Sequence, residues 1–309
     1  MTTTRRRLRH PFRLAAVALV VVALVVALAV LVSLAIRAAG SSLRRAPVIV
    51  PAQCLATAGG HSSAITLEQA GNAAIIAGES MRRGLPPRAA TIGLVTAWQE
   101  SHLRNLDYGD RDSLGLFQQR PSQGWGTPEQ IMDPWYAAGA FYAALVKVPG
   151  WQTGVINDVA QAVQRSGYPD AYAQHEANGR AWASALTGQS PAAVRCLDRG
   201  TVPGDPAVAA ALLQRIWGDA VRIETTGRTL LVTVPDAATA WAVAQVTLAN
   251  TATAGVARAE VGSWSWTMST DHLAAWSDGT PSATPTVTPS PSPVRLQPNQ
   301  ARLTLRGPG

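Results

Sequence analysis

The sequence predicts a mainly α-helical domain followed by a small α+β module, both behind an N-terminal membrane helix. Three observations carry this prediction: a charge-free apolar run near the N-terminus, helical patterns separated by glycine and proline turns up to about residue 199, and strand-like alternation after it. A chain of 309 residues is long enough for one or two packed domains. The predicted segments are a cytoplasmic basic segment (1–13), a transmembrane helix (14–36), a linker (37–50), the mainly α domain (51–199), the α+β module (203–279) and a disordered tail (280–309).

The run from Leu14 to Ile36 contains no charged residue and consists mostly of Ala, Val and Leu. As a helix it would be about 34 Å long and would cross a bilayer core of about 30 Å. Five arginines precede the run and three follow it, which predicts a cytoplasmic N-terminus and an exported remainder. A signal peptide is the alternative, but its apolar stretch is shorter, about 7 to 15 residues. We therefore expect an uncleaved, single-pass anchor.

The formal net charge of +7 and the pI of about 10.2 would fit a nucleic-acid partner at first sight. However, eight of the 26 basic residues lie before Ala46 and three lie after Gly279, so 15 basic residues accompany all 19 acidic residues between these positions. This middle region is mildly acidic and has no basic patch with interleaved aromatic residues. We expect no nucleic-acid partner and assign the positive charge to membrane topology.

The chain has two cysteines, Cys54 and Cys196, near the two ends of the predicted α domain. A disulfide between them would persist in an exported protein, and closing so long a loop would stabilise the fold by about 5 kcal/mol in the chain-entropy model. Two buried free thiols are the alternative. The histidines are scattered without ligand spacing, so we expect no metal and no cofactor.

Helices dominate the region 51–199. A capping box at Thr66 and Gln69 starts a helix that ends at Gly84. A second helix begins after Pro86 and runs to about His102, where a polar loop with several glycines begins. Further helices are predicted at about 134–147, 155–165 and 169–186.

The pattern changes after about residue 203. A helix (206–217), two alternating segments, a second helix (236–250) and two more alternating segments predict the order αββαββ. This module contains no cluster of candidate catalytic groups, so we expect it to bind or position, and a protein partner in the cell envelope would fit this role. The region 280–309 begins with a Pro/Ser/Thr tract that cannot bury a core, so we expect it to be disordered.

One carboxylate, Glu100, ends the second predicted helix. Ala89, Gly93 and Ala97 precede it at intervals of four or three residues, so they share its helix face, and their small side chains would let another segment come close. The opposite side is apolar, so we expect Glu100 to be partly desolvated. Burial raises a carboxyl pKa, as a general acid for glycosidic cleavage requires. The common alternative is a solvated glutamate at a helix end.

The motifs around Glu100 resemble the lysozyme-like superfamily, specifically the soluble lytic transglycosylases. In that family an "ES" pair contains the catalytic acid and a "GLMQ" turn follows; here Glu100 and Ser101 are followed by "GLFQ". The resemblance covers about residues 51–199 and implies a lysozyme-like fold with Glu100 as the catalytic residue. It further implies that the substrate-binding residues include Ser101, Gly115, Leu116, Phe117 and Gln118.

The sequence departs from the family at one motif. The family's Ala-Tyr-Asn segment falls on "AVQRS", which places Val163 and Gln164 where Tyr and Asn are expected. The group that would hydrogen-bond to Glu100 is therefore open. Tyr168 or Tyr172 could replace the missing hydroxyl, or could only pack.

The resemblance implies cleavage of peptidoglycan glycan strands on the cell-wall side of the membrane. Glu100 would protonate the oxygen between N-acetylmuramic acid and N-acetylglucosamine, and the substrate's own N-acetyl group would support the positive charge. Glu100 would then act as a base on the muramyl 6-hydroxyl, which closes a 1,6-anhydro ring. A lysozyme-type hydrolase would need a second carboxylate. Its candidates are Asp107, Asp110 and Asp112, although such residues more often form turns.

A glycan cleft also needs rings and amide groups. Trp125, which has glycine on both sides, and the paired amides of Gln118 and Gln119 are candidates. A second hypothesis is a non-catalytic peptidoglycan-binding scaffold, which the missing Tyr-Asn pair would fit. The retained Glu100 and "GLFQ" turn favour the enzyme.

Overall fold

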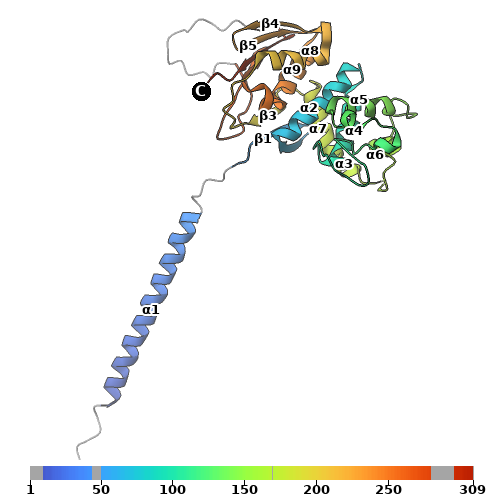
Figure 1. Cartoon of the computed structure of the whole chain (residues 1–309). Helices are drawn as coiled ribbons and strands as arrows, with labels where there is room; N and C mark the ends of the chain where they lie inside the picture. Colours follow the sequence, from blue (N-terminus) through green and yellow to red (C-terminus); the bar gives the residue numbers. More distant parts are fainter. Residues whose placement is uncertain (1–9, 44–49, 169, 280–295, 309) are drawn as a thin grey trace, which may run out of the picture. The chain divides into compact units, whose positions relative to one another are not determined.

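A computed structural model of the chain describes residues 10–43, 50–168, 170–279 and 296–308. The chain forms two compact units, Met1–Val50 and Pro51–Gly309 (Figure 1). Residues 1–9 of the predicted basic segment and 44–49 of the predicted linker lie outside the described residues, whereas 37–43 continue the first helix and so correct the start of the linker.

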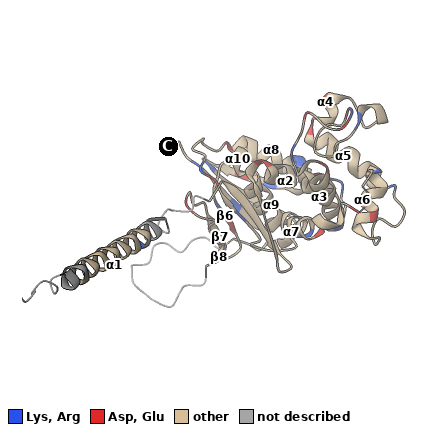
Figure 2. Ribbon diagram, turned by 90° about the horizontal axis from the view of Figure 1, so that it is seen from below, with Lys and Arg blue, Asp and Glu red and all other residues tan. Residues whose placement is uncertain are grey.

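The described part of the first unit is the helix α1 (His10–Leu43). Its stretch Ala15–Ala38 is long and apolar enough to cross a membrane, and Figure 2 shows no charged residue along its middle. Its valine and leucine side chains are exposed in the chain itself. An apolar surface of this kind is stable in lipid and not in water. The predicted apolar helix is confirmed, and it fits a single-pass protein or a signal anchor.

The second unit begins with a hairpin that the sequence analysis did not predict. Strands β1 (Gln53–Ala58) and β2 (His61–Thr66) are antiparallel, and β3 (Val194–Leu197) pairs with the other edge of β1. Gly59 and Gly60 have positive φ angles of 58° and 76°, which suit a two-residue turn between twisted strands. The prediction of helices throughout 51–199 was wrong here, because the small and polar residues of these strands give a weak alternating pattern.

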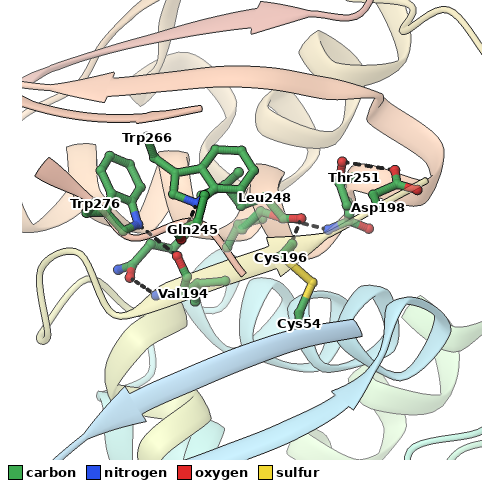
Figure 3. The surroundings of a disulfide bond; sticks show 12 residues. Cys54, Val194, Cys196, Asp198, Gln245, Leu248, Thr251, Trp266 and Trp276 are labelled. Carbon is green, nitrogen blue, oxygen red and sulfur yellow. Dashed lines mark hydrogen bonds between the residues drawn. A yellow bond between two sulfur atoms is a disulfide. The ribbon is translucent and has the colours of Figure 1, made fainter. Parts of the chain in front are cut away.

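The disulfide between Cys54 and Cys196 is confirmed. The two residues are directly opposite each other in the β1–β3 register, with Cα atoms 4.0 Å apart. Figure 3 shows the bond between the two strands, with Gln245, Trp266 and Trp276 on the other side of β3. The bond therefore joins the start of the helical region to its end.

The helical region is mainly α, as predicted, and the capping box at Thr66 and Gln69 is present. Its helices are α2 (Leu67–Arg82), α3 (Pro87–Ser101), α4 (Pro128–Ile131), α5 (Pro134–Leu145), α6 (Ile156–Gln164) and α7 (Glu176–Leu186). Helix α3 lies at the centre and packs against α2, α5, α6 and α7. A Cβ atom at Gly93 would lie 2.5 Å from the Tyr142 hydroxyl, so the small residues of α3 permit the close approach of α5.

The second part of this unit follows the predicted αββαββ order and extends it. Its elements are α8 (Pro206–Trp217), β4 (Arg222–Thr226), β5 (Thr229–Thr233), α9 (Ala237–Ala249), α10 (Thr251–Ala254), β6 (Val256–Val261), β7 (Trp264–Thr267), β8 (Ser277–Asp278) and β9 (Gln300–Leu305). They form a six-stranded sheet with the order β4-β5-β9-β6-β7-β8.

Strand β9 corrects the prediction of a disordered tail over 280–309. It pairs on both sides, with β5 and β6, and so lies inside the sheet (Figure 1). Ala301, Leu303 and Leu305 alternate along it and are buried. The prediction failed because the Pro/Ser/Thr composition was extended to the end of the chain, past a short alternating strand pattern. Residues 280–295 lie outside the described residues.

Helix α9 joins the helical region to the six-stranded sheet. Its Gln245 side chain is completely buried and accepts hydrogen bonds from the backbone N–H groups of Ala193 (2.7 Å) and Val194 (2.9 Å). The same amide donates to the carbonyl oxygens of Ala185 (2.7 Å) and Ser190 (3.0 Å). Four hydrogen bonds to a buried amide leave none of its polar capacity unused. Gln245 therefore links α9 to the backbone at the end of α7 and at the start of β3.

Candidate functional site

Glu100 lies in the last turn of α3, at the place where the helix ends. His102 and Leu103 have positive φ angles of 53° and 60°, and the Leu103 N–H bonds back to the Ala97 carbonyl at 3.1 Å. This left-handed turn stops the helix two residues after the carboxylate. The chain then enters the polar loop, as the sequence predicted, so Glu100 stands at the junction of a buried helix and a loop.

Burial is the main cause that raises the pKa of Glu100 above its usual value. The neighbouring Tyr172 hydroxyl and the Gln164 amide oppose this rise, because hydrogen bonds stabilise the charged form. Among the described residues, no cation contributes to the shift in the Glu100 pKa. A carboxyl group in this setting holds its proton to a higher pH than a solvated glutamate does, which is a requirement for a general acid.

Tyr172 is the hydroxyl partner of Glu100. Its side chain is completely buried, and its hydroxyl donates a 2.6 Å hydrogen bond to Oε1 of Glu100. Burial raises the pKa of Tyr172, and the Glu100 charge adds to this, so the phenol keeps its proton. Tyr168, the other candidate from the sequence, is 77% exposed. The structure thus decides between the two tyrosines that the sequence left open.

Gln164 connects the Glu100 site to the "GLFQ" turn. It is the last residue of α6, and its Nε2 donates a 2.7 Å hydrogen bond to the Phe117 carbonyl. Its Oε1 atom is buried and accepts no hydrogen bond from the described residues. The residue that departs from the family pattern is therefore a polar neighbour of the candidate acid.

The "GLFQ" turn is built into the protein interior. Gly115 has a φ of 76°, and a Cβ atom there would lie 2.7 Å from the Ile131 carbonyl oxygen. Leu116 and Phe117 are completely buried, and Phe117 stacks on Phe141 with ring centroids 4.6 Å apart. These residues position the turn by packing. Because the side chains of Leu116 and Phe117 are buried, a substrate would have to contact other residues.

Ser101 ties this turn to the end of α3. Its hydroxyl is buried and lies 3.0 Å from the Ala97 carbonyl and 2.7 Å from the Leu116 carbonyl. The bond to Leu116 spans the loop, so the position of Glu100 relative to the turn depends on it. Ser101 is thus a positioning residue in this arrangement.

The two glutamines of the turn have different surroundings. Gln118 has a φ of 46°, and its amide donates to the Tyr108 and Gly115 carbonyls at 3.3 Å each. Gln119 is 1% exposed and donates to the Ala137 carbonyl at 3.1 Å, which anchors the turn to α5. Only the Gln118 side chain is partly accessible to a ligand.

The predicted sugar-stacking tryptophan, Trp125, is half-buried and packs against the core. Its carbonyl accepts a 3.2 Å hydrogen bond from the Tyr136 hydroxyl. The site that the structure assembles therefore contains Glu100, Tyr172 and Gln164, together with Ser101 and the turn. Gln119 is buried against α5, and Tyr168 makes no hydrogen bond to Glu100 within the described part of the chain.

The three loop aspartates do not form hydrogen bonds with Glu100 in the described part of the chain. Asp112 accepts from Arg120 Nε (2.7 Å) and from the Ser122 N–H (2.8 Å), and Arg120 is the main cause that lowers its pKa. Asp110 is exposed and lies 3.9 Å from Arg111, and Asp107 is exposed. Asp112 thus joins Arg120 and Ser122 across the loop, which favours a structural role.

A second polar group lies on the same turn of α3 and was missed by the sequence analysis. Gln99 Oε1 is 3.0 Å from His175 Nε2 and accepts a 3.1 Å hydrogen bond from Gln174. His175 stacks on Trp98 with ring centroids 6.2 Å apart, and burial lowers its pKa. His175 lies far away in the sequence, so no local pattern could have shown this contact.

No model of a known protein family matches the chain, and no curated protein sequence is significantly similar to it. Within the described ranges, His, Cys, Asp and Glu side chains do not gather in a group of three that could hold a metal ion. The interpretation of the Glu100 site therefore depends on its own geometry.

Proposed function

We propose that the protein is a membrane-anchored enzyme that cleaves peptidoglycan glycan strands, with Glu100 as its general acid and base. The observation that carries this proposal is a partly buried carboxyl group with a raised pKa whose oxygen is held by a neutral tyrosine hydroxyl at 2.6 Å. A general acid works best when its pKa lies near the working pH. The order of Glu100, the "GLFQ" turn and the following helices supports the lysozyme-like interpretation.

The reaction proposed is that of a lytic transglycosylase. Glu100 gives its proton to the oxygen between N-acetylmuramic acid and N-acetylglucosamine, and becomes a carboxylate. The Tyr172 hydrogen bond becomes stronger as this charge develops, because bonds to an ionised acceptor are stronger than neutral ones. The substrate's N-acetyl group stabilises the positive charge at the anomeric carbon. Glu100 then removes a proton from the muramyl 6-hydroxyl, which closes the 1,6-anhydro ring.

A second carboxylate is not needed for this reaction. Asp112 is held in a charged state by Arg120, which favours a structural role over that of a second catalytic group. The disulfide supports an oxidising compartment, and α1 would place the Pro51–Gly309 unit on the cell-wall side, with the arginine-rich N-terminus in the cytoplasm.

The test is mass spectrometry of soluble products after the full chain, in detergent micelles, is incubated with purified peptidoglycan. Anhydro-muropeptides from the unchanged protein, and none from Glu100→Gln, are the expected result. Products with reducing ends would instead indicate a hydrolase. The protein used must include β9, because a fragment that ends at Gly279 lacks an inner strand of the sheet.

The second candidate is a non-catalytic peptidoglycan-binding scaffold. The burial of Gln119 and the packing of Trp125 favour it, because they reduce the number of groups free to grip a sugar. Retained binding to the cell wall without any soluble product would support this alternative.

A further inference from the structure

A cavity of about 630 Å³ lies between α2, α5 and α8, and Glu100 is not part of its lining. Arg82 and Arg83 line it and come shortly before the first turn of α3, whereas Glu100 is in the last turn. About 20 Å of helix separates these two ends. Any function of this cavity is thus separate from the chemistry of Glu100.

The cavity contains a buried carboxylate that two arginines hold. Glu79 is 2% exposed, and Arg82 contacts both of its oxygens, at 2.6 Å from Nε and 2.7 Å from Nη2. Arg83 Nε donates to the same carboxylate at 2.7 Å. Gly139 makes room for this cluster, since a Cβ atom there would lie 2.9 Å from Arg83 Nη2. Two guanidinium groups on one carboxylate leave one positive charge in excess.

Several donors of these arginines are not used within the described part of the chain. Arg83 donates to Glu79 only through Nε, so both of its Nη groups remain available. The side chains of Arg82 and Arg83 are 45% and 33% exposed, so a ligand in the cavity can reach them. Glu79 therefore holds the guanidinium groups of Arg82 and Arg83 in place, and their unused N–H donors remain accessible to a ligand in the cavity.

A third guanidinium group comes from the α+β part of the protein. Arg215 of α8 lies over the Trp135 ring, with Cζ 4.5 Å from the ring centroid. This cation–π contact orients the group without using its N–H donors. The three elements are in close contact, because a Cβ atom at Gly78 of α2 would lie 2.9 Å from Ile216 and 3.2 Å from Trp135.

We propose that this cavity binds a ligand with one free carboxylate next to an apolar group, specifically the C-terminal end of a short peptide. The guanidinium fork matches the geometry of a carboxylate, and Glu79 already shows this match inside the cluster. Trp135 and Ala143 supply an apolar wall for the side chain of the peptide's C-terminal residue. The volume is within the usual range for small ligands, about 300 to 1,000 Å³.

The charge of the lining favours a carboxylate over a phosphate. Three arginines face two acidic residues, Glu79 and Asp133, which leaves a single positive charge in excess. One carboxylate carries a single negative charge and would neutralise this excess. A phosphate dianion carries two negative charges and would leave the site with a net negative charge. The inference does not depend on the reaction proposed for Glu100.

The test is a ligand-observed NMR titration of the full chain in detergent micelles with acetyl-Ala-Ala-Ala. The free acid is expected to bind, and its C-terminal amide to bind at least about tenfold more weakly, because charge-assisted hydrogen bonds are lost. Arg215→Gln is expected to weaken the acid by about tenfold. Arg222→Gln is the matched control: it removes the same charge from an arginine that is 79% exposed on β4, outside the cavity lining, and should leave binding unchanged.

A second variant keeps the test decisive if Arg215→Gln disturbs the fold. Ala143→Glu adds a carboxylate to the cavity wall without removing a contact of the arginines, and should weaken the acid at least about tenfold by competing for them. Equal binding of acid and amide, no binding of the acid, or equal effects of Arg215→Gln and Arg222→Gln would overturn the proposal. Displacement of the peptide by inorganic phosphate at lower concentration would also overturn it, in favour of a phosphate site.

Discussion

Glu79 and Glu100 both lie near the C-terminal ends of helices, yet their partners differ. Glu79 is bound by the guanidinium groups of Arg82 and Arg83, whereas Glu100 is bound by the neutral hydroxyl of Tyr172. Both Glu79 oxygens are used in ion pairs with guanidinium groups, whereas Glu100 has a neutral hydroxyl partner and a pKa that burial raises. The comparison teaches that the kind of partner, and not burial alone, decides which glutamate suits acid–base chemistry.

Removing the Glu100 carboxylate gives the largest expected effect. Glu100→Gln should lower the rate of glycan cleavage at least about 1,000-fold, because a general acid contributes about 10²- to 10⁴-fold and this group would act twice in the proposed reaction. The rate of release of soluble muropeptides measures this loss. A variant with more than a tenth of the original rate would contradict the assignment.

The same variant should not lose stability at pH 7. The folded state raises the pKa of Glu100, so it binds the proton more tightly than the unfolded state does, and ionisation above the unfolded pKa costs stability. Glutamine cannot ionise. The melting temperature of Glu100→Gln should therefore equal or exceed that of the original protein at pH 7, and this advantage should disappear in acid.

Glu79→Gln should show the opposite behaviour. It leaves Arg82 and Arg83 side by side without their shared anion, so we expect the free energy of unfolding to fall by about 2 kcal/mol, after allowing for the partial exposure of both arginines. Denaturant titration measures this change. Cleavage by the folded fraction should stay normal, and a loss of activity without a loss of stability would break the comparison.

Tyr172→Phe sharpens the role of the neutral partner. Without its hydroxyl, Glu100 loses a bond that favours the charged form, so its pKa should rise further. The proposed reaction needs protonated Glu100, so its rate should fall as the pH rises through this pKa, and in the variant the fall of kcat/KM should move to higher pH. We expect a loss of about tenfold at the optimum. Tyr168→Phe is the control, since this exposed tyrosine should leave the pH profile unchanged.

Ser101→Ala should have the smallest effect. It removes the 2.7 Å hydrogen bond that ties the end of α3 to the Leu116 carbonyl, at a cost of about 1 kcal/mol in the free energy of unfolding. The rate of cleavage should fall several-fold while the pH profile keeps its shape, because the acid remains but its position is less well held. A shifted pH profile would mean that Ser101 acts on the Glu100 charge directly.

Local signals carried the correct predictions. The capping box at Thr66, the end of a helix just after Glu100 and the apolar run of α1 all depend on residues that are close together in the chain. The disulfide was predictable because the chain has two cysteines and an N-terminal apolar helix typical of exported proteins. The position of the candidate acid followed from the same local pattern.

The failures occurred where the pattern was weak or the partners were distant. The β1–β2 hairpin is short and rich in small and polar residues, and β9 follows a Pro/Ser/Thr tract that hid its alternation. Trp125 and Gln119 were predicted as sugar-binding groups; their contacts with the core and with α5 come from distant parts of the chain that the local sequence does not show. Composition alone does not show which side chains distant segments of the chain will bury.

The apolar N-terminal helix, the cysteine pair and the place of Glu100 at a helix end could all be predicted from the sequence, because they depend on short-range composition and spacing or on the number of cysteines. Only the tertiary structure decided that Tyr172, 72 residues away, holds Glu100. It also decided that Arg215 of α8 joins the arginines of α2 in one cavity. Such contacts depend on how whole helices pack, and packing is a property of the complete core that no local stretch of sequence contains.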